Sequence, residues 1–227
     1  MTHLVEDLKA PYTDIKNLAS QLSCPNGDEG IAIGKIMNQS NQNMVLQSIK
    51  ALNLEEKNRV LELGHGNAAH VPHLMKQAID LRYFGMEISS TMKQQAEQNN
   101  TRLIKKKWAL FQLYDGKNID YVPKFFDRIL TVNTIYFWEK PLEFLNEMFR
   151  LLKPEGLFVL TFVDKDFMER LPFVSEQIFN LYNTPKLKKL IEQTQFKTVS
   201  IKSQVEPALS KTGEMVNREY TIVALTK

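Results

Sequence analysis

The sequence predicts an α/β protein with an open, doubly wound sheet of mostly parallel strands. Three observations lead to this class. Short apolar runs alternate with segments of helical period, a glycine-containing loop follows the first run, and two strand-like runs close the sequence with no helix between them. Apolar residues at successive positions indicate strands covered on both faces, as in a parallel sheet between helices. The expected strands are Val60–Leu63, Arg82–Glu87, Trp108–Leu113, Phe126–Val132, Leu157–Val163, Phe196–Ile201 and Glu219–Leu225.

The segments between the first strands have the apolar period of helices. Val71–Ile79 carries apolar residues at positions i, i+3, i+4, i+7 and i+8, which predicts an amphipathic helix. A second helix is expected after a cap at Ser89 or Ser90. Pro141 opens a third, and Lys153–Gly156 predicts a turn into the next strand.

The last two expected strands are joined by a polar stretch without helical period. Parallel neighbours need a long crossover, usually a helix, so this pair is expected to be antiparallel. The sequence therefore predicts a parallel sheet that ends in an antiparallel strand.

The first part of the chain lies outside the strand–helix alternation. Residues 1–55 predict a helical cap that is part of the same domain as the core, residues 56–227. Leu4–Leu22 and Asn43–Leu54 are the expected helices of this cap. Between them, the polar stretch Cys24–Gly34 contains three glycines and is expected to be irregular.

The composition is that of an ordinary soluble globular protein. A net charge of +3 gives no strong general attraction to nucleic acid or to a membrane. The single cysteine, Cys24, excludes an intramolecular disulfide, and the charged residues of Met1–Asn17 are unlike a secretory signal. The longest apolar run, Gly156–Val163, is too short to cross a bilayer. We expect a cytoplasmic protein without a membrane span.

The most informative stretch is the loop after the first strand. Gly64 and Gly66 let the backbone turn tightly and let a ligand approach it, and the following segment points free N–H groups at that ligand. The pattern Gly64-x-Gly66-x-x-Ala69 satisfies the looser nucleotide-binding motif of a Rossmann-like fold. Glu87 ends the second strand about 20 residues further on, where a carboxylate can accept from ribose hydroxyls. This much allows either NAD or S-adenosylmethionine.

Other polar residues at strand ends favour S-adenosylmethionine. Glu62, two residues before Gly64, can hold the loop or meet the ammonium of a methionine moiety, but it would repel a pyrophosphate. Asp115, followed by Gly116, comes after the third strand and can accept from an adenine amino group. Asn133 ends the fourth strand, and ligands of open α/β sheets bind beyond such strand ends.

These motifs, taken in order, resemble those of class I S-adenosylmethionine-dependent methyltransferases. The resemblance runs from about Leu54 to the C-terminus and is strongest to the small-molecule branch that includes the ubiquinone and menaquinone biosynthesis methyltransferases. It implies a seven-stranded sheet with an antiparallel last strand. The sequence departs from the family pattern at Ala68, where the family often has glycine. The cofactor-binding residues it implies are Glu62, Gly64, His65 and Gly66 for the methionine part, Glu87 and Ile88 for the ribose, and Asp115, Gly116 and Asn133 around the adenosine.

Two further groups are expected to contact the substrate. The segment containing Asn38 and Asn41 resembles a part of an uncharacterised subgroup of these enzymes, and it implies a lid that excludes water. Tyr136, Phe137 and Trp138 follow the fourth strand directly, so at least one of them is expected in the pocket of a small-molecule acceptor.

The sequence argues against metal and nucleic acid as partners. His65, His70 and His73 lie near one another, but no cysteine cluster or carboxylate completes a metal site. The basic run Lys105–Lys107 is expected to be a solvated surface. Asn133–Tyr136 lacks the two prolines that base amino-methyltransferases tend to carry.

The resulting hypothesis is methyl transfer to a small molecule by in-line attack on the sulfonium methyl of S-adenosylmethionine. The residues assign no catalytic base. Two alternatives stay open: an NAD(P)-dependent oxidoreductase, which a parallel last strand would favour, and a non-catalytic binding module on the same fold.

Overall fold

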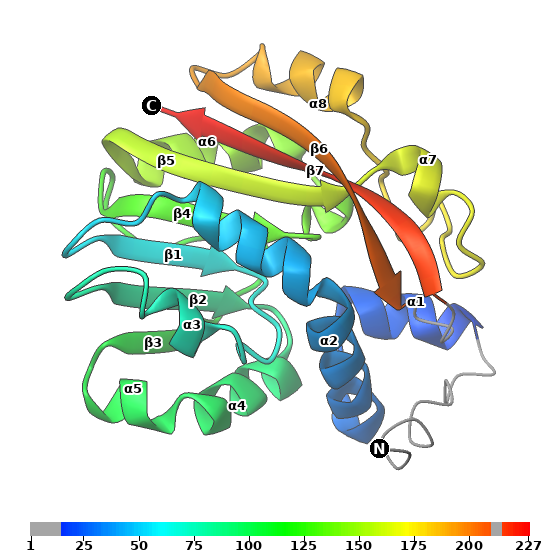
Figure 1. The fold of residues 1–227 in the computed structure, drawn as a ribbon, viewed down its shortest axis with the longest axis horizontal. Helices are drawn as coiled ribbons and strands as arrows, with labels where there is room; N and C mark the ends of the chain where they lie inside the picture. Colours follow the sequence, from blue (N-terminus) through cyan, green and yellow to red (C-terminus); the bar gives the residue numbers. More distant parts are fainter. Residues whose placement is uncertain (1–14, 210–214) are drawn as a thin grey trace.

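The computed structural model describes residues 15–209 and 215–227, which form a seven-stranded sheet flanked by helices (Figure 1). The strand order is β3-β2-β1-β4-β5-β7-β6, and β7 is antiparallel to both of its neighbours while all other pairs are parallel. The predicted fold class, with its antiparallel last strand, is confirmed. The strands are β1 (Arg59–Leu63), β2 (Arg82–Glu87), β3 (Ala109–Leu113), β4 (Phe126–Val132), β5 (Leu152–Val163), β6 (Lys197–Leu209) and β7 (Met215–Thr226).

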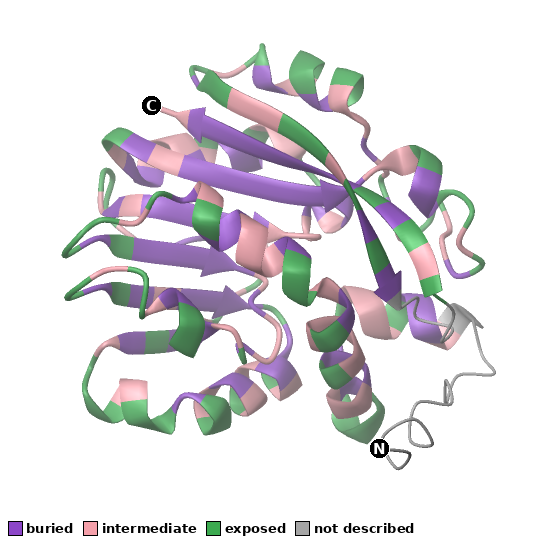
Figure 2. Ribbon diagram, viewed as in Figure 1, coloured by how far each residue is buried: buried purple, intermediate pink, exposed green. Residues whose placement is uncertain are grey.

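The central strands form the core because their apolar runs are covered on both faces. Leu61 on β1 lies beside Ile129 on β4, and both side chains are fully buried. Figure 2 shows the same burial along β1, β4, β5 and β7, whereas exposed residues lie on the outer strands and helices. Consecutive apolarity was the correct signal for these strands.

The strand order reverses at β1, and this positions the candidate site. The chain moves outward from β1 to β2 and β3, then returns to β4 on the other side of β1. At such a switch point the loops after the two central strands diverge and leave a crevice at the carboxyl ends. Gly64 follows β1 and Asn133 follows β4, so both lie at this crevice.

The helices differ from the expected ones mainly in the N-terminal part of the chain. Among them, α2 crosses one face of the sheet and contacts β4, β5 and the β6–β7 pair, while α6 contacts β5 (Figure 1). The helices are α1 (Ile15–Ser23), α2 (Gly27–Ala51), α3 (Val71–Leu74), α4 (Ser90–Asn99), α5 (Thr101–Lys105), α6 (Pro141–Leu151), α7 (Lys165–Met168) and α8 (Thr184–Ile191), with a 3₁₀ turn η2 (Ile135–Phe137).

The prediction that Cys24–Gly34 is irregular is wrong, because helix α2 begins within this stretch at Gly27 and continues to Ala51. Its internal glycines serve close packing. A Cβ on Gly30 would lie 2.7 Å from the carbonyl carbon of Pro25, and a Cβ on Gly34 would lie 2.6 Å from the Met92 sulfur. Tertiary contacts thus override the low helix propensity of glycine. Residues 4–14 of the first predicted helix lie outside the described residues, and the remainder corresponds to α1.

The predicted helix Val71–Ile79 is also wrong in length, since α3 ends at Leu74. The next turns have i to i+3 bonds, such as Gln77 N–H to the Leu74 carbonyl at 3.0 Å, and Asp80 reverses the chain at φ +55°. The connection of residues 75–81 between α3 and β2 therefore consists of turns rather than α-helix. Ile79, expected on the buried stripe, is 71% exposed.

Strands near the C-terminus are longer than predicted. The expected turn Lys153–Gly156 lies within β5, where Glu155 has φ +62° and the pairing with β4 slips between Phe126 and Arg128. β6 and β7 extend well beyond their apolar runs and pair as a long antiparallel ribbon.

Ser89 caps α4 as expected, because its hydroxyl accepts from Met92 N–H at 3.0 Å.

Candidate functional site

A cavity lies at the carboxyl ends of β1, β2 and β4, with α2 as one wall; we call it the polar cavity. Its empty space, including the solvent at its mouth, is about 1020 Å³. It brings together most of the residues that the sequence predicted. These are Glu62, Gly64, His65, Gly66, Glu87, Ile88, Gly116 and Asn133 from the core, Asn38 and Asn41 from α2, and Phe137 and Trp138 after β4.

The two glycines after β1 have different functions. Both have positive φ, +68° at Gly64 and +56° at Gly66. A Cβ on Gly64 would lie 2.4 Å from Cγ2 of Thr134, so glycine is needed there for packing. A Cβ on Gly66 would meet nothing within 4 Å, and this leaves the backbone open to a ligand.

Glu87 fastens this loop to the end of β2. Its Oε2 accepts from Gly66 N–H at 2.9 Å, and its Oε1 accepts from Ile88 N–H at 2.8 Å and Ser89 N–H at 3.1 Å. The side chain is buried. A carboxylate has about four acceptor positions, so three internal bonds leave about one for a hydroxyl of a ligand.

Glu62 is a buried carboxylate with two side-chain donors on one oxygen. Its Oε2 accepts from Tyr83 Oη at 2.7 Å and contacts His70 Nε2 at 2.8 Å. Burial raises the pKa of Glu62, but His70 and the Tyr83 hydroxyl more than offset this and leave the pKa below its ordinary value. Glu62 therefore stays anionic at neutral pH on the wall of the polar cavity.

His65 lines the same cavity and has one buried ring nitrogen without a partner among the described residues. Its Nδ1 contacts the Gly66 carbonyl oxygen at 2.8 Å, and its ring packs edge-on against Phe111. Burial lowers the pKa of His65, although Glu87 and Glu62 act in the opposite direction. In the neutral ring Nδ1 donates, so Nε2 carries a lone pair. This buried Nε2 has no partner in the described part of the chain.

Asp115 is placed differently from the other predicted residues. It is exposed, and it does not line the polar cavity. Its carboxylate closes its own loop by accepting from the N–H groups of Asn118 at 2.7 Å and Lys117 at 2.8 Å. The Asn118 N–H bond, followed by that of Lys117, lowers the pKa of Asp115 to about 2. Gly116 and the neighbouring Tyr114 line the cavity instead.

The predicted lid residues Asn38 and Asn41 lie on α2 and line the cavity. The N-terminal half of this helix is tied to the loops after β1 and β2. Asn67 Nδ2 reaches the Gly34 carbonyl at 3.4 Å, and Ser89 Oγ donates to the Pro25 carbonyl. The wall is thus a packed helix rather than the irregular segment that the sequence suggested.

The three aromatic residues after β4 point into two different spaces. Trp138 lines the polar cavity and stacks on Phe144 at 4.5 Å, whereas Tyr136 lines a second cavity, and Phe137 lines both. This second cavity, which we call the aromatic chamber, has a volume of about 670 Å³. It is lined by Leu22, Met37, Asn41, Asn133, Tyr136, Phe137, Val163, Phe167, Met168, Leu171, Phe173, Phe179, Ala208, Val216 and Arg218.

Several functional positions were missed at the sequence level. Tyr83 and His70 contact Glu62. The alternation of side chains along β2, which pairs with β1, is the one signal that could have suggested Tyr83. Arg218 and Glu206 lie directly opposite each other on β7 and β6, which requires the strand register to be known. Among residues 15–209 and 215–227, no group of three or more potential ligands could hold a metal ion. None of the described helices is both long and apolar enough to cross a membrane.

Comparison with known proteins finds a methyltransferase domain in the chain. Residues 61–160 match the family model described as a methyltransferase domain. The uncharacterized methyltransferase YdaC of Bacillus subtilis is 27% identical over 131 residues, which are 56% of this chain and 68% of that protein.

Two solved structures have the same fold. A SAM-dependent methyltransferase from Aquifex aeolicus superposes with a TM-score of 0.61 at 17% identity, covering 95% of this chain and 100% of the other. The phosphoethanolamine N-methyltransferase 2 of Haemonchus contortus, in complex with phosphomonomethylethanolamine and S-adenosylhomocysteine, superposes with a TM-score of 0.67 at 15% identity, covering 96% and 61%. Residues 61–160 thus match a methyltransferase domain, and the chain has the fold of these two methyltransferase structures.

Proposed function

We propose that this protein transfers the methyl group of S-adenosylmethionine to a small-molecule acceptor, with the cofactor in the polar cavity and the acceptor in the aromatic chamber. One observation carries the proposal: the two cavities share lining residues at the switch point of the sheet. The shared residues are Leu22, Met37, Asn41, Asn133 and Phe137. Two ligands, one bound in each cavity, would therefore meet at this boundary.

The residues of the polar cavity fit the cofactor chemically. The ammonium of its methionine part needs an acceptor, and the Glu62 carboxylate on the cavity wall supplies one. Gly66 leaves the backbone open beside it. Glu87 retains about one acceptor position for a ribose hydroxyl, and Ile88 and Gly116 form the adjoining wall.

The adenine end is assigned differently from the motif-based expectation. Because Asp115 already accepts bonds within its own loop, we assign the adenine to the wall around Tyr114 and Gly116 rather than to the Asp115 carboxylate.

The protein contributes orientation and the exclusion of water. When bound, S-adenosylmethionine would supply an electrophilic methyl carbon to a lone pair of the acceptor. Asn41 and Asn133 lie where the acceptor and the methyl group would meet. Helix α2, as a lid within one domain with the core, closes this space from water.

The aromatic residues offer no base of suitable strength. Burial raises the pKa of Tyr136 far above its ordinary value. Its hydroxyl is also within 3.1 Å of Asn133 Oδ1 and of the Val163 carbonyl oxygen. We therefore assign Tyr136 to positioning Asn133 and assign no catalytic base.

Several observations support a small molecule as acceptor. The motifs resemble the branch that contains the ubiquinone and menaquinone methyltransferases, and the similar N-methyltransferase has a small acceptor in its complex. The antiparallel β7 disfavours the oxidoreductase alternative.

Calorimetric titration of the full chain with S-adenosylhomocysteine, and with NADH in a parallel run, tests the cofactor assignment. We expect micromolar binding of S-adenosylhomocysteine alone. NADH binding in its place would support the oxidoreductase, and binding of neither would support a binding module without methyltransferase activity.

A further inference from the structure

We propose that the acceptor is a neutral, largely apolar molecule seated in the aromatic chamber, with an oxygen atom directed at the side-chain amides of Asn41 and Asn133. This inference rests on the proposed function and specifies its substrate class. Four properties of the chamber carry it: its walls, its charge balance, the orientation of its two amides and the contacts that fix them.

The chamber walls are almost wholly apolar. Aromatic rings from three segments meet around it, with ring centroids of Phe137 and Phe179 5.2 Å apart and those of Phe173 and Phe179 6.3 Å apart. Met168 adds an adaptable side chain. Such walls favour a ligand that buries apolar surface, at roughly 25 cal/mol per Å² removed from water.

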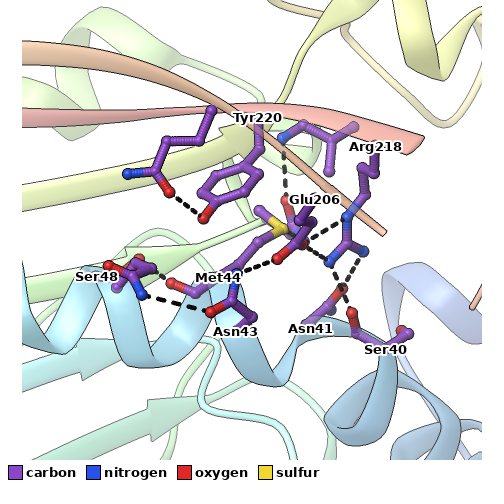
Figure 3. Close-up of polar contacts among 12 residues, drawn as sticks. Ser40, Asn41, Asn43, Met44, Ser48, Glu206, Arg218 and Tyr220 are labelled. Carbon is purple, nitrogen blue, oxygen red and sulfur yellow. Dashed lines mark hydrogen bonds and ion pairs between the residues drawn. The ribbon is translucent and has the colours of Figure 1, made fainter. Parts of the chain in front are cut away.

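Arg218 is the charged residue of the chamber lining, and its charge is already paired. Its Nε donates to Glu206 Oε1 at 3.1 Å, and its Nη2 contacts the same oxygen (Figure 3). Both side chains are more than nine-tenths buried. An ionised ligand would lose its hydration without gaining a free counter-ion, so the chamber selects a neutral molecule.

The orientation of Asn41 follows from the same pair. Arg218 Nη1 donates to Asn41 Oδ1 at 2.9 Å, and because a guanidinium only donates, this atom must be the amide oxygen. Asn41 Nδ2 makes no hydrogen bond to any other described residue. The amide therefore offers N–H groups at the boundary of the two cavities.

Asn133 is oriented in the same way by different partners. Val163 N–H donates to Tyr136 Oη at 2.6 Å and, at 3.3 Å, to Asn133 Oδ1, which favours the amide oxygen on this side. The Tyr136 hydroxyl lies 3.1 Å from the same Oδ1 and from the Val163 carbonyl oxygen. Within the described residues, the one partner of Asn133 Nδ2 is the sulfur of Met44 at 3.9 Å. Two amides that present donors to one boundary favour a ligand with oxygen lone pairs, such as a hydroxyl or a carbonyl.

The Arg218–Glu206 pair also holds the segment of α2 that carries Asn41. Arg218 Nη2 donates to the Ser40 carbonyl at 2.7 Å, and Asn43 Nδ2 donates to Glu206 Oε2 (Figure 3). The β6–β7 ribbon thus fixes both ends of one helical turn. This makes the donor of Asn41 a preorganised feature of the chamber.

Matched probes test the class of ligand. We would titrate the full chain, saturated with S-adenosylhomocysteine, with 2-naphthol, 2-naphthoate and naphthalene. The two-ring skeleton is constant, while the polar group is a neutral hydroxyl, an anion or absent. We expect 2-naphthol to bind at least about tenfold more tightly than either of the others, which corresponds to about 1.4 kcal/mol. Equal or tighter binding of 2-naphthoate would overturn the neutral class.

Two pairs of variants locate the probe. Val216→Trp, on the chamber wall, should weaken 2-naphthol binding by about tenfold or more, whereas Val205→Trp, 64% exposed on the same ribbon, should leave it unchanged. Asn41→Ala should remove the preference for 2-naphthol over naphthalene, and Asn217→Ala, at an exposed position of β7, should retain it.

Each variant is first titrated with S-adenosylhomocysteine, and its fold is checked by circular dichroism. If the unmodified protein does not bind S-adenosylhomocysteine, the proposed function itself is contradicted. Normal S-adenosylhomocysteine binding with equal effects of Val216→Trp and Val205→Trp would contradict only the assignment of the chamber.

Discussion

The polar cavity and the aromatic chamber lie side by side at one edge of the sheet, yet they treat charge in opposite ways. In the polar cavity, the side chains of Glu62 and Glu87 are held by hydroxyl, imidazole and backbone N–H groups. In the chamber, Arg218 and Glu206 neutralise each other. One space is therefore suited to a cationic, polar ligand and the other to a neutral one.

The difference follows from how each space is built. The polar cavity is made at the ends of β1 and β2, where backbone groups are free to bind a carboxylate. The chamber is made from side chains of α2, the segment after β5 and the β6–β7 ribbon, so it has few free backbone groups. A substitution in the two spaces should thus have different consequences.

The largest effect is expected from removing one partner of the buried ion pair. Arg218→Met should lower the free energy of unfolding by about 3–5 kcal/mol, because Glu206 is then a buried charge without a counter-ion. Urea unfolding measures the change. The control is Lys140→Met, whose partner Glu143 is 70% exposed; this change should cost no more than about 1 kcal/mol. Similar losses in both variants would show that the chamber does not depend on this pair.

A smaller effect is expected at the carboxylate that binds the glycine loop. Glu87→Ala should weaken S-adenosylhomocysteine binding by about 1.5–3 kcal/mol, or roughly 10- to 150-fold, through loss of the ribose contact and of the Gly66 bond. Calorimetry measures it, with Glu97→Ala, a surface partner of Lys93, as control. Unchanged affinity would remove Glu87 from the cofactor site.

The smallest effect concerns the ionisation of Glu62. Tyr83→Phe removes the hydroxyl donor and should lower the free energy of unfolding at pH 7 by about 1.5 kcal/mol, the lower end for a bond to a charged group, because His70 still contacts the same oxygen.

This prediction has a defined pH dependence. The pKa of Glu62 is lowered in the folded protein, so its stabilisation is fully present above its ordinary value of 4.5 and is lost as the pH falls through the folded-state pKa. The difference in free energy of unfolding between Tyr83→Phe and the unmodified protein should shrink as the pH falls through this folded-state pKa. Tyr121→Phe, whose hydroxyl donates to the uncharged Gln112, is the control and should show no such change. A pH-independent difference for Tyr83→Phe would mean that Glu62 is not the relevant acceptor.

Local patterns in the sequence predicted the sheet and the end of it where the candidate site lies. Runs of apolar residues located the first five strands, and two further strand-like runs with no helix between them indicated β6 and the antiparallel β7. Both signals are local in the chain, because strand burial and connection type depend on neighbouring residues. The residues at the ends of β1, β2 and β4 fell into one cavity because the carboxyl ends of parallel strands share an edge.

Which atoms at that edge are available depends on contacts between residues far apart in the chain. Asp115 follows β3 as expected, but its carboxylate is engaged by its own loop. Helix α2 replaces a predicted irregular segment because Gly34 packs against Met92, far away in the sequence. The pairing of Arg218 with Glu206, and with it the neutral chamber and the orientation of Asn41, depends on strand register. Residue types fix what each group can donate or accept, but only long-range packing fixes which partner it meets.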